Sequence, residues 1–258
     1  MYWIGDRVAV TSRTIASLES ALGSASESLL PLEVDLTDED SVQAALEKTV
    51  STFGGLDVVV NNAGYGQQGT IEALTDRELR QNVEVNVFAP LNVLRHALPY
   101  MRRQRSGYII NIASIVGFQG GYAGWGSYAA SKFALAGLTE SLAAEVAELG
   151  IKVTILYPGP VRTDFLSSGS LAIAEHKIDD YTQAQASLDL HLGSLAGNQA
   201  GDPDKLAMLI MQSSDVPAPP LHLFAGHIAN ELALQKMQDV RKDIDAWKGA
   251  AEATDFID

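Results

Sequence analysis

The chain of 258 residues contains no cysteine, and this absence excludes several kinds of site. Without thiols there is no disulfide bond, no thiolate nucleophile and no cysteine-ligated metal. The sequence also lacks any apolar run approaching the ~20 residues that a membrane span needs. Its first residues, MYWIG, are too short for the apolar core of a signal peptide. We therefore expect a soluble, cytoplasmic protein.

Basic residues are scarce. The 18 lysines and arginines face 32 acidic residues, which gives a net charge of -14. Nucleic acids and anionic membranes favour basic patches, so neither is an expected partner. The five histidines show no i, i+4 pairing, and we expect no metal site. A hydrophobic content of 47% with 19% charged residues is typical of a chain with a globular core.

Short apolar segments alternate with amphipathic segments of helical period along most of the chain. This alternation is typical of βαβ units and a parallel sheet, and no linker or repeat divides residues 1–258, so we expect one α/β domain. The expected strands are 7–11, 29–34, 56–60 (buried on both faces), 107–113, 151–156 and 221–224. The expected helices are 15–22, one capped by Thr37 with Asp40 in its first turn, 75–103, 127–149, 206–211 and 231–247. Between 163 and 201 the pattern fades into a loop with one or two helices.

Five polar motifs stand in order along the chain, some at the ends of predicted strands and some on predicted helices. They are NNAG at 61–64, Asn86, Ser114, Tyr128-x-x-x-Lys132 and PGPVRT at 158–163. In this order and spacing, the sequence from Gly5 onward resembles the short-chain dehydrogenase/reductase family. The resemblance implies a Rossmann-like, doubly wound parallel sheet. It also implies an oxidoreductase that moves hydride between a nicotinamide cofactor and a carbonyl or secondary alcohol, with the loop at 163–201 covering the substrate.

The spacing of Tyr128 and Lys132 explains the chemistry of this pair. At i and i+4 the two side chains share one face of a helix. An ammonium group beside a phenol favours the phenolate, so we expect the tyrosine pKa to fall from ~10 towards neutral pH. Such a group can serve as the general acid/base in carbonyl reduction or alcohol oxidation. Ser114 would hydrogen-bond the substrate oxygen, and by resemblance Asn86 holds a water that links Lys132 to solvent.

The interval from Ser114 to Tyr128 is one residue longer than is commonest in the family. The extra residue falls in a glycine-rich segment, GFQGGYAGWGS, where a loop can absorb it.

The resemblance also implies cofactor contacts. Asp35 matches the acid that meets the adenine amine, and Thr163 matches the residue that holds the nicotinamide carboxamide. The turn under the nicotinamide ribose is matched by Asn61, Ala63 and Gly64, with Lys132 beside it. Arg13 follows the strand at 7–11, where a basic group pairs with a 2′-phosphate and an acid with a free hydroxyl. The expected cofactor is therefore NADP(H).

Aromatic residues flank the expected site, and helices 76–103 and 127–149 correspond to the family's usual dimer surfaces. The aromatic side chains are Tyr65, Tyr122, Trp125 and Phe165. They either line a pocket for a cyclic or aromatic substrate or only pack the loops. By resemblance, the chain is expected to form a homodimer or homotetramer.

The opening MYWIGDRVAVTSR lacks the strand, glycine-rich TGxxxGxG turn and helix with which the family begins, a unit of roughly 25 residues. In one arrangement, residues 7–11 remain the second strand of the family's sheet. The central position of the missing first strand is then empty, removed by closure of the sheet, or filled by another chain. In the other arrangement, which we call the slide, residues 7–11 occupy the central position of the missing first strand. Thr11–Thr14 then becomes a substitute phosphate loop. We favour the slide because it keeps the sheet continuous. Arg13 would then no longer indicate a preference for a cofactor with a 2′-phosphate.

Two further functions compete with the oxidoreductase. A dehydratase, isomerase or cyclase would keep the proton chemistry of Ser114, Tyr128 and Lys132 without a dinucleotide. A binding or scaffolding pseudoenzyme would keep only the fold. The complete set of polar motifs counts against the pseudoenzyme. The absent phosphate loop counts against the oxidoreductase, because backbone contacts to the pyrophosphate support dinucleotide binding.

Overall fold

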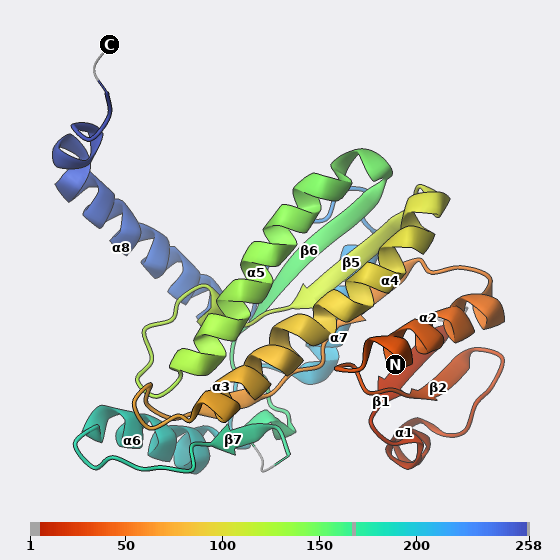
Figure 1. Ribbon diagram of the computed structural model, residues 1–258, viewed down its shortest axis with the longest axis horizontal. Helices are drawn as coiled ribbons and strands as arrows, with labels where there is room; N and C mark the ends of the chain where they lie inside the picture. Colours follow the sequence, from red (N-terminus) through yellow and green to blue (C-terminus); the bar gives the residue numbers. More distant parts are fainter. Residues whose placement is uncertain (1–5, 167–168, 257–258) are drawn as a thin grey trace.

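The computed structural model describes residues 6–166 and 169–256 as strands layered between helices (Figure 1). Its main sheet has four parallel strands in the order β3–β5–β6–β8. These are β3 (Val58–Asn61), β5 (Gly107–Ile112), β6 (Ile151–Pro158) and β8 (His222–Ala225). The Rossmann-like α/β fold predicted from the alternating segments is confirmed.

Helices cover both faces of this sheet, because neighbouring strand residues point to opposite sides. On β5, Ile109 packs with residues of α4 (Ala89–Gln104) and α5 (Gly126–Val146). Ile110, the next residue, packs on the opposite face with residues of α7 (Pro203–Asp215). Both isoleucines are almost fully buried, so β5 lies at the centre of the core.

The first two strands form a separate parallel pair. β1 (Val8–Ser12) hydrogen-bonds β2 (Leu29–Glu33) through a register that runs from Val8 opposite Leu29 to Ser12 opposite Glu33. The short helix α1 (Ile15–Leu22) connects them. Within the described residues, no ladder joins β1 to β3. The expected slide of residues 7–11 into the position beside β3 is therefore wrong, because β1 pairs with β2 on one edge and with no described strand on the other.

The helix α2 (Glu39–Phe53) joins this pair of strands to the rest of the molecule by packing against α4. The Asn92 amide of α4 donates to the carbonyl of Leu36 at 3.1 Å, and His96 and Arg95 both contact the Glu39 carboxylate. The two sheets are therefore linked through helices, which Figure 1 shows lying side by side.

The cap of α2 differs from the expectation. Asp38 is the N-cap, and its carboxylate accepts from the backbone N–H of Asp40 at 3.1 Å. The hydroxyl of Thr37 instead donates to Asp35 at 2.7 Å. An aspartate one residue later satisfies the helix N–H, so Thr37 is left free to close the turn after β2.

The third strand is buried on one face only, which corrects a second expectation. Val58 and Val60 are each 42% exposed, whereas Val59 between them is buried. By register, Val58 and Val60 lie on the same face as Tyr108 and Ile110 of β5. Helix α7 packs on this face over the middle of the sheet. It does not extend over β3, so Val58 and Val60 are exposed.

The remaining elements complete the site region. Thr75 and Glu78 form the expected capping box of α3 (Asp76–Val83), and one π-helical turn (Glu84–Phe88) carries the chain into α4. In the segment after 163, β7 (Leu171–Ile173) pairs with β4 (Gly66–Gln68), a small sheet that the sequence did not predict. This segment also contains α6 (Thr182–Asp189).

The last helix, α8 (His227–Glu252), extends away from the body of the molecule (Figure 1). In the ranges that the structure describes, no helix combines the length and apolar character that crossing a membrane requires.

Candidate active site

The polar residues singled out in the sequence meet at the carboxyl ends of β3 and β5. Tyr128 and Lys132 come from the first turns of α5, Ser114 lies two residues beyond the end of β5, and Asn86 lies in the π-helical turn before α4. Tyr128, Lys132 and Asn86 are 6%, 4% and 0% exposed, while Ser114 is half-buried. Three buried polar side chains beside a more accessible hydroxyl are suited to proton transfer at one substrate atom.

Ser114 lies close enough to Tyr128 for its hydroxyl group to lower the pKa of the phenol. The longer interval between them is absorbed by a 3-10 turn (Ile115–Gly117), whose N-cap is Ser114. The Ser114 hydroxyl oxygen accepts from the backbone N–H of Val116 at 3.2 Å, which orients the side chain. The extra residue therefore does not disturb the Ser–Tyr alignment.

Asn86 joins the turn after β3 to helix α5. Its side-chain oxygen accepts from the backbone N–H of Tyr65 at 3.0 Å. Its amide group donates to the carbonyl of Tyr65 at 3.0 Å and to the hydroxyl of Ser131 at 2.9 Å. The water link to Lys132 stays a prediction, whereas these three bonds give Asn86 a positioning role.

Burial controls the titration of the central pair. Burial raises the pKa of Tyr128 to about 12, and the hydrogen bond from Ser114 offsets only part of this rise. Burial also lowers the pKa of Lys132 to about 8. The Lys132 ammonium donates to the carbonyl of Ile112 at 2.8 Å and lies 5.9 Å from the centre of the Tyr128 ring. The expected lowering of the tyrosine pKa is therefore wrong in direction, because desolvation outweighs the more distant ammonium.

The depressed pKa of Lys132 predicts a pH-dependent stability. Between about pH 8 and 10.5 the unfolded chain keeps a proton on this lysine that the folded chain has lost, so the free energy of unfolding rises with pH. Lys132→Met removes this contribution. We expect the difference in unfolding free energy between wild type and variant to change by up to roughly 3 kcal/mol across this window. Urea denaturation at pH 7.5, 9 and 10.5 measures it, and parallel pH curves for the two proteins would contradict the prediction.

The NNAG turn passes directly beside these side chains. A Cβ atom added to Gly64 would lie 2.9 Å from the Asn86 side-chain oxygen and 3.3 Å from the Lys132 ammonium. Asn61 instead donates its amide to Asn111 at 2.8 Å across β3 and β5, so its side chain holds the two strands together. Ala63 is exposed. Gly64 is thus the member of this turn closest to the cluster.

Aromatic rings surround Tyr128 as the sequence predicted. The rings of Trp125 and Phe165 lie 6.0 and 5.6 Å from the Tyr128 ring, and Tyr122 packs in the same cluster. The hydroxyl of Thr163 accepts from the backbone N–H of Phe165 at 3.3 Å. The loop that contains Thr163 therefore approaches the cluster through Phe165.

Arg13 and Asp35 lie near each other at the ends of β1 and β2. Hydrogen bonds from Thr37 and the positive charge of Arg13 hold the pKa of Asp35 below its usual range. Both side chains are exposed. Because β1 has not moved into the central slot, Arg13 keeps the position at which the resemblance places recognition of the ribose.

The N-terminus of α1 already contacts a carboxylate. The backbone N–H of Ile15 donates to the Glu33 side chain at 3.0 Å, and the Thr14 hydroxyl donates to Ser17 at 3.0 Å. A carboxylate at this position repels a phosphate group, so the substitute phosphate loop expected at Thr11–Thr14 is not supported. The contacts expected of Arg13, Asp35, Gly64 and Thr163 with the two ends of a dinucleotide stay predictions, and we find no matching site for its pyrophosphate within 6–166 and 169–256.

Comparisons with known proteins show the family to which the chain belongs. Residues 4–172 match the family model for short chain dehydrogenases. The chain belongs to this family. The oxidoreductase BOA17 of Botryotinia fuckeliana is 31% identical over 245 residues, which cover 95% of this chain and 88% of the relative.

Solved structures give the same result for this short-chain dehydrogenase. The crystal structure of a short-chain dehydrogenase from Streptomyces avermitilis has 33% identity and a TM-score of 0.88, covering 98% of this chain and 91% of that one. ElxO with NADP bound has 26% identity and a TM-score of 0.68, covering 86% and 89% of the two chains. The chain is therefore an oxidoreductase-family protein with a Rossmann-like fold.

Three residues that support the cluster were not predicted from the sequence. Ser131 accepts from Asn86, and the Asn82 amide donates to the carbonyl of Tyr65 at 3.1 Å. Asn82 precedes Asn86 by four residues, so helical spacing was the signal that would have found it. Gly117 lies so close to α5 that a Cβ atom there would stand 2.8 Å from the backbone of Lys132. Nothing in the local sequence indicates that approach.

Proposed function

We propose that this chain transfers hydride between NADP(H) and a carbonyl or secondary alcohol, with Tyr128 as the general acid/base. The buried cluster of Tyr128, Lys132 and Asn86, with the hydroxyl of Ser114 beside the tyrosine, is the observation that carries the proposal. Two neighbouring hydroxyl groups can hold a single carbonyl oxygen from two directions. This arrangement supports proton transfer at one defined atom.

The protonation state of Tyr128 favours its role as an acid. With a pKa of about 12, the phenol keeps its proton at neutral pH and can donate it to the oxygen of a carbonyl that is being reduced. Ser114 orients that oxygen, and the buried ammonium of Lys132 favours the phenolate left behind. A bound reduced nicotinamide supplies the hydride.

The proposed cofactor contacts lie at the two ends of the dinucleotide. Arg13 would pair with a 2′-phosphate and Asp35 would meet the adenine, while Gly64 and Thr163 would lie along the nicotinamide end. Glu33 at the N-terminus of α1 disfavours the pyrophosphate between them. We therefore expect weak binding, with a preference for NADPH over NADH.

The surroundings of Tyr128 support an apolar substrate. Tyr122, Trp125 and Phe165 place three aromatic rings around the phenol, which suits a cyclic or aromatic carbonyl compound. By family resemblance, the chain acts as a homodimer or homotetramer that uses the exposed faces of α3, α4 and α5.

Cofactor titration tests the proposal. NADPH and NADH are each added to the protein up to about millimolar concentration, with binding followed by nicotinamide fluorescence. Arg13→Ala is expected to weaken NADPH binding by roughly tenfold and to leave NADH binding unchanged. Arg102→Ala, an equal loss of charge at the far end of α4, is the matched control. Absence of binding by both cofactors would refute the oxidoreductase proposal.

The second candidate is a non-redox enzyme that uses the same proton chemistry. The contact between Glu33 and the N-terminus of α1 favours it, because this contact opposes the pyrophosphate of any dinucleotide. If neither nicotinamide binds, turnover of a cyclic carbonyl compound that Tyr128→Phe abolishes would support the dehydratase, isomerase or cyclase. No turnover with an intact fold would support the pseudoenzyme.

A further inference from the structure

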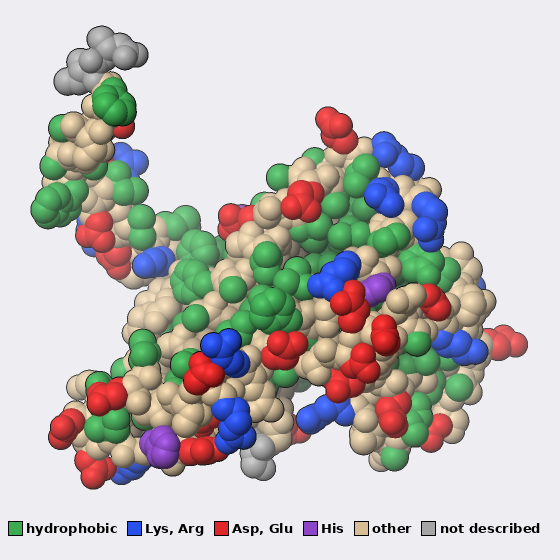
Figure 2. Space-filling model, in the orientation of Figure 1, with side chains coloured by type: hydrophobic (Ala, Val, Ile, Leu, Met, Phe, Trp, Pro, Cys, Tyr) green, Lys and Arg blue, Asp and Glu red, His purple; other side chains and the backbone are tan. Residues whose placement is uncertain are grey.

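Helix α6 and the π-helical turn after it (Leu190–Leu195) lie beside the start of α5 (Figure 1), and we call residues 182–195 the cover segment. Ala184, Ser187 and His191 share one face of this segment, because they are spaced by three and four residues. Ala184 is buried and the other two are half-buried. Figure 2 shows acidic side chains on the outer surface of this part of the molecule. The cover segment therefore has a packed inner face and a solvated outer face.

Trp125 is the residue that the inner face of the cover segment contacts. Its indole N–H donates to the Ser187 hydroxyl at 3.2 Å, and the His191 ring lies 4.7 Å from the indole ring. The Nδ1 atom of His191 is 2.6 Å from the carbonyl oxygen of Ser187. Because a carbonyl only accepts, Nδ1 carries a proton, and this bond holds the imidazole against the indole. Trp125 is only 3% exposed, so its N–H depends on Ser187 rather than on water.

Trp125 also contacts the phenol of Tyr128, three residues later in the chain. The two rings meet edge to face, with their centres 6.0 Å apart and their planes at 68°. Trp125 therefore connects Ser187 on the cover segment to Tyr128 in the candidate site. Burial raises the pKa of Tyr128 to about 12, so the protonation of the phenol depends on the groups that exclude water from it.

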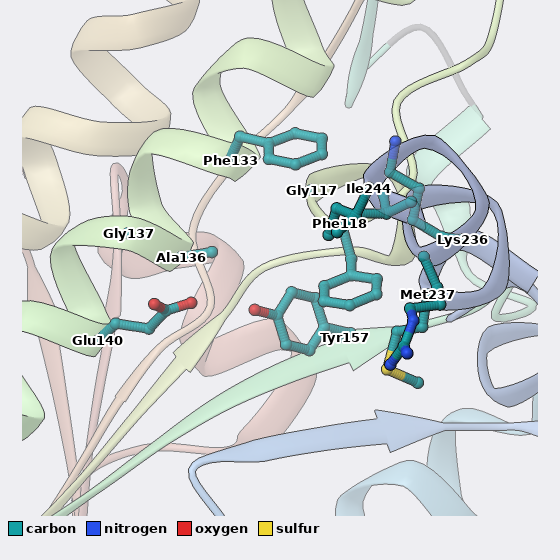
Figure 3. A pocket seen from close by; sticks show the side chains of 12 residues that line it. Gly117, Phe118, Phe133, Ala136, Gly137, Glu140, Tyr157, Lys236, Met237 and Ile244 are labelled. Carbon is teal, nitrogen blue, oxygen red and sulfur yellow. The ribbon is translucent and has the colours of Figure 1, made fainter. Parts of the chain in front are cut away.

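The groove between α5 and α8 is separate from these contacts. It has a volume of about 530 Å³, and Phe118, Phe133 and Tyr157 line it opposite residues of α8 (Figure 3). Neither Tyr128 nor Lys132 is among its lining residues. A ligand in this groove would not touch the phenol, so the groove lies outside the candidate site.

We propose that Trp125 is a positioning residue through which the cover segment holds the Tyr128 phenol in the orientation that proton transfer requires. With the segment in place, Ser187 and His191 fix the indole, and the indole fixes the phenol ring. If the segment moves away, the buried indole N–H loses its acceptor and the ring loses its outer contact, so the phenol is no longer held. Proton transfer is then efficient only while the cover segment is closed. The inference rests on the proposed role of Tyr128 as general acid/base.

Removal of the hydrogen bond between Trp125 and Ser187 tests this inference in the full chain. Ser187→Ala is expected to lower kcat for an aromatic ketone roughly tenfold and to leave the KM for NADPH unchanged, because the proposed cofactor contacts lie on other elements. Trp125→Phe keeps an aromatic ring without the N–H and should also lower kcat. The double variant should be no slower than Trp125→Phe, since both substitutions remove the same bond. Ser187→Thr retains a hydroxyl group and is expected to recover most of the wild-type kcat.

Ser194→Ala is the matched control, because it makes the same substitution at an exposed position of the cover segment. It is expected to leave kcat unchanged. The fluorescence of Trp125 gives a second readout that does not depend on turnover. With Trp3 and Trp247 replaced by phenylalanine, Trp125 is the only tryptophan. In this background, Ser187→Ala is expected to raise the quenching of Trp125 by acrylamide roughly threefold, and Ser194→Ala is not.

The two readouts distinguish failure of this inference from failure of the proposed function, with circular dichroism to check that each variant is folded. The inference is overturned if Ser187→Ala and Ser194→Ala have equal kcat or equal quenching. It is also overturned if the losses of the two single variants multiply in the double variant. Absence of turnover by the wild type refutes the proposed function and the positioning role with it. Unequal quenching would then show that Trp125 still depends on the cover segment.

Discussion

Replacing Tyr128 with phenylalanine is expected to lower kcat by about 100- to 10,000-fold, the contribution typical of a positioned acid or base. The variant loses only the hydroxyl group that would donate the proton. The ring keeps its contacts with Trp125 and Phe165, so the fold and the affinity for cofactor should be unchanged. Steady-state kinetics with an aromatic ketone and NADPH measures the loss. Circular dichroism and nicotinamide fluorescence check the fold and the binding.

Tyr157→Phe provides the matched control. Tyr157 is also buried, and burial together with the nearby charge of Glu140 raises its pKa to about 12. It packs with Phe118 and Phe224 in a separate cluster. Its replacement should change kcat by no more than about threefold, since no reacting atom is near it. Equal activity of the Tyr128 variant and this control would rule out Tyr128 as the proton donor.

Asn86→Ala is expected to lose both stability and activity. The side chain is fully buried and makes three hydrogen bonds, two of them with the backbone of Tyr65 and one with Ser131. Truncation leaves buried polar groups without partners, which costs roughly 3 kcal/mol of unfolding free energy. It also releases the turn that contains Gly64 from α5. Urea denaturation measures the first effect, and kcat under conditions where the variant is folded measures the second.

Asn92→Ala is a suitable comparison for this variant. Asn92 is also buried and in α4, but its amide makes a single hydrogen bond, to the carbonyl of Leu36. Its loss should cost about 1 kcal/mol and leave kcat unchanged. If the two variants were equally stable, or if the folded Asn86 variant kept full kcat, the positioning role of Asn86 would be wrong.

The sequence allowed the main sheet and the central cluster to be predicted in advance. The alternation of apolar segments predicted β3, β5, β6 and β8, and helical spacing placed Tyr128 and Lys132 on one face of α5. These features depend on local periodicity and on short motifs, which the residues themselves carry. The same reasoning predicted the capping box at Thr75 and Glu78.

Other features depend on tertiary context and were not predictable. Val58 and Val60 read as buried because both are apolar, but their exposure depends on how far α7 extends over the sheet. The pKa of Tyr128 depends on how completely the site is desolvated. The i, i+4 spacing of Lys132 gives no information about that burial. Continuity of the sheet suggested that β1 would move beside β3. Among the described strands no ladder joins β1 to β3, and the unit is instead linked to the molecule by the packing of α2 on α4.

The separation of β1 and β2 from the main sheet has a consequence for cofactor affinity. A two-stranded sheet has little independent stability, so we expect this unit to open at lower free energy than the core, as its own cooperative segment. Arg13 and Asp35 both belong to it. The adenosine end of a dinucleotide would therefore bind only the closed fraction, and the apparent affinity would be reduced by that fraction. Cofactor binding would then be coupled to closing of this segment. Saturating cofactor would raise the free energy of its local opening towards that of the rest of the chain.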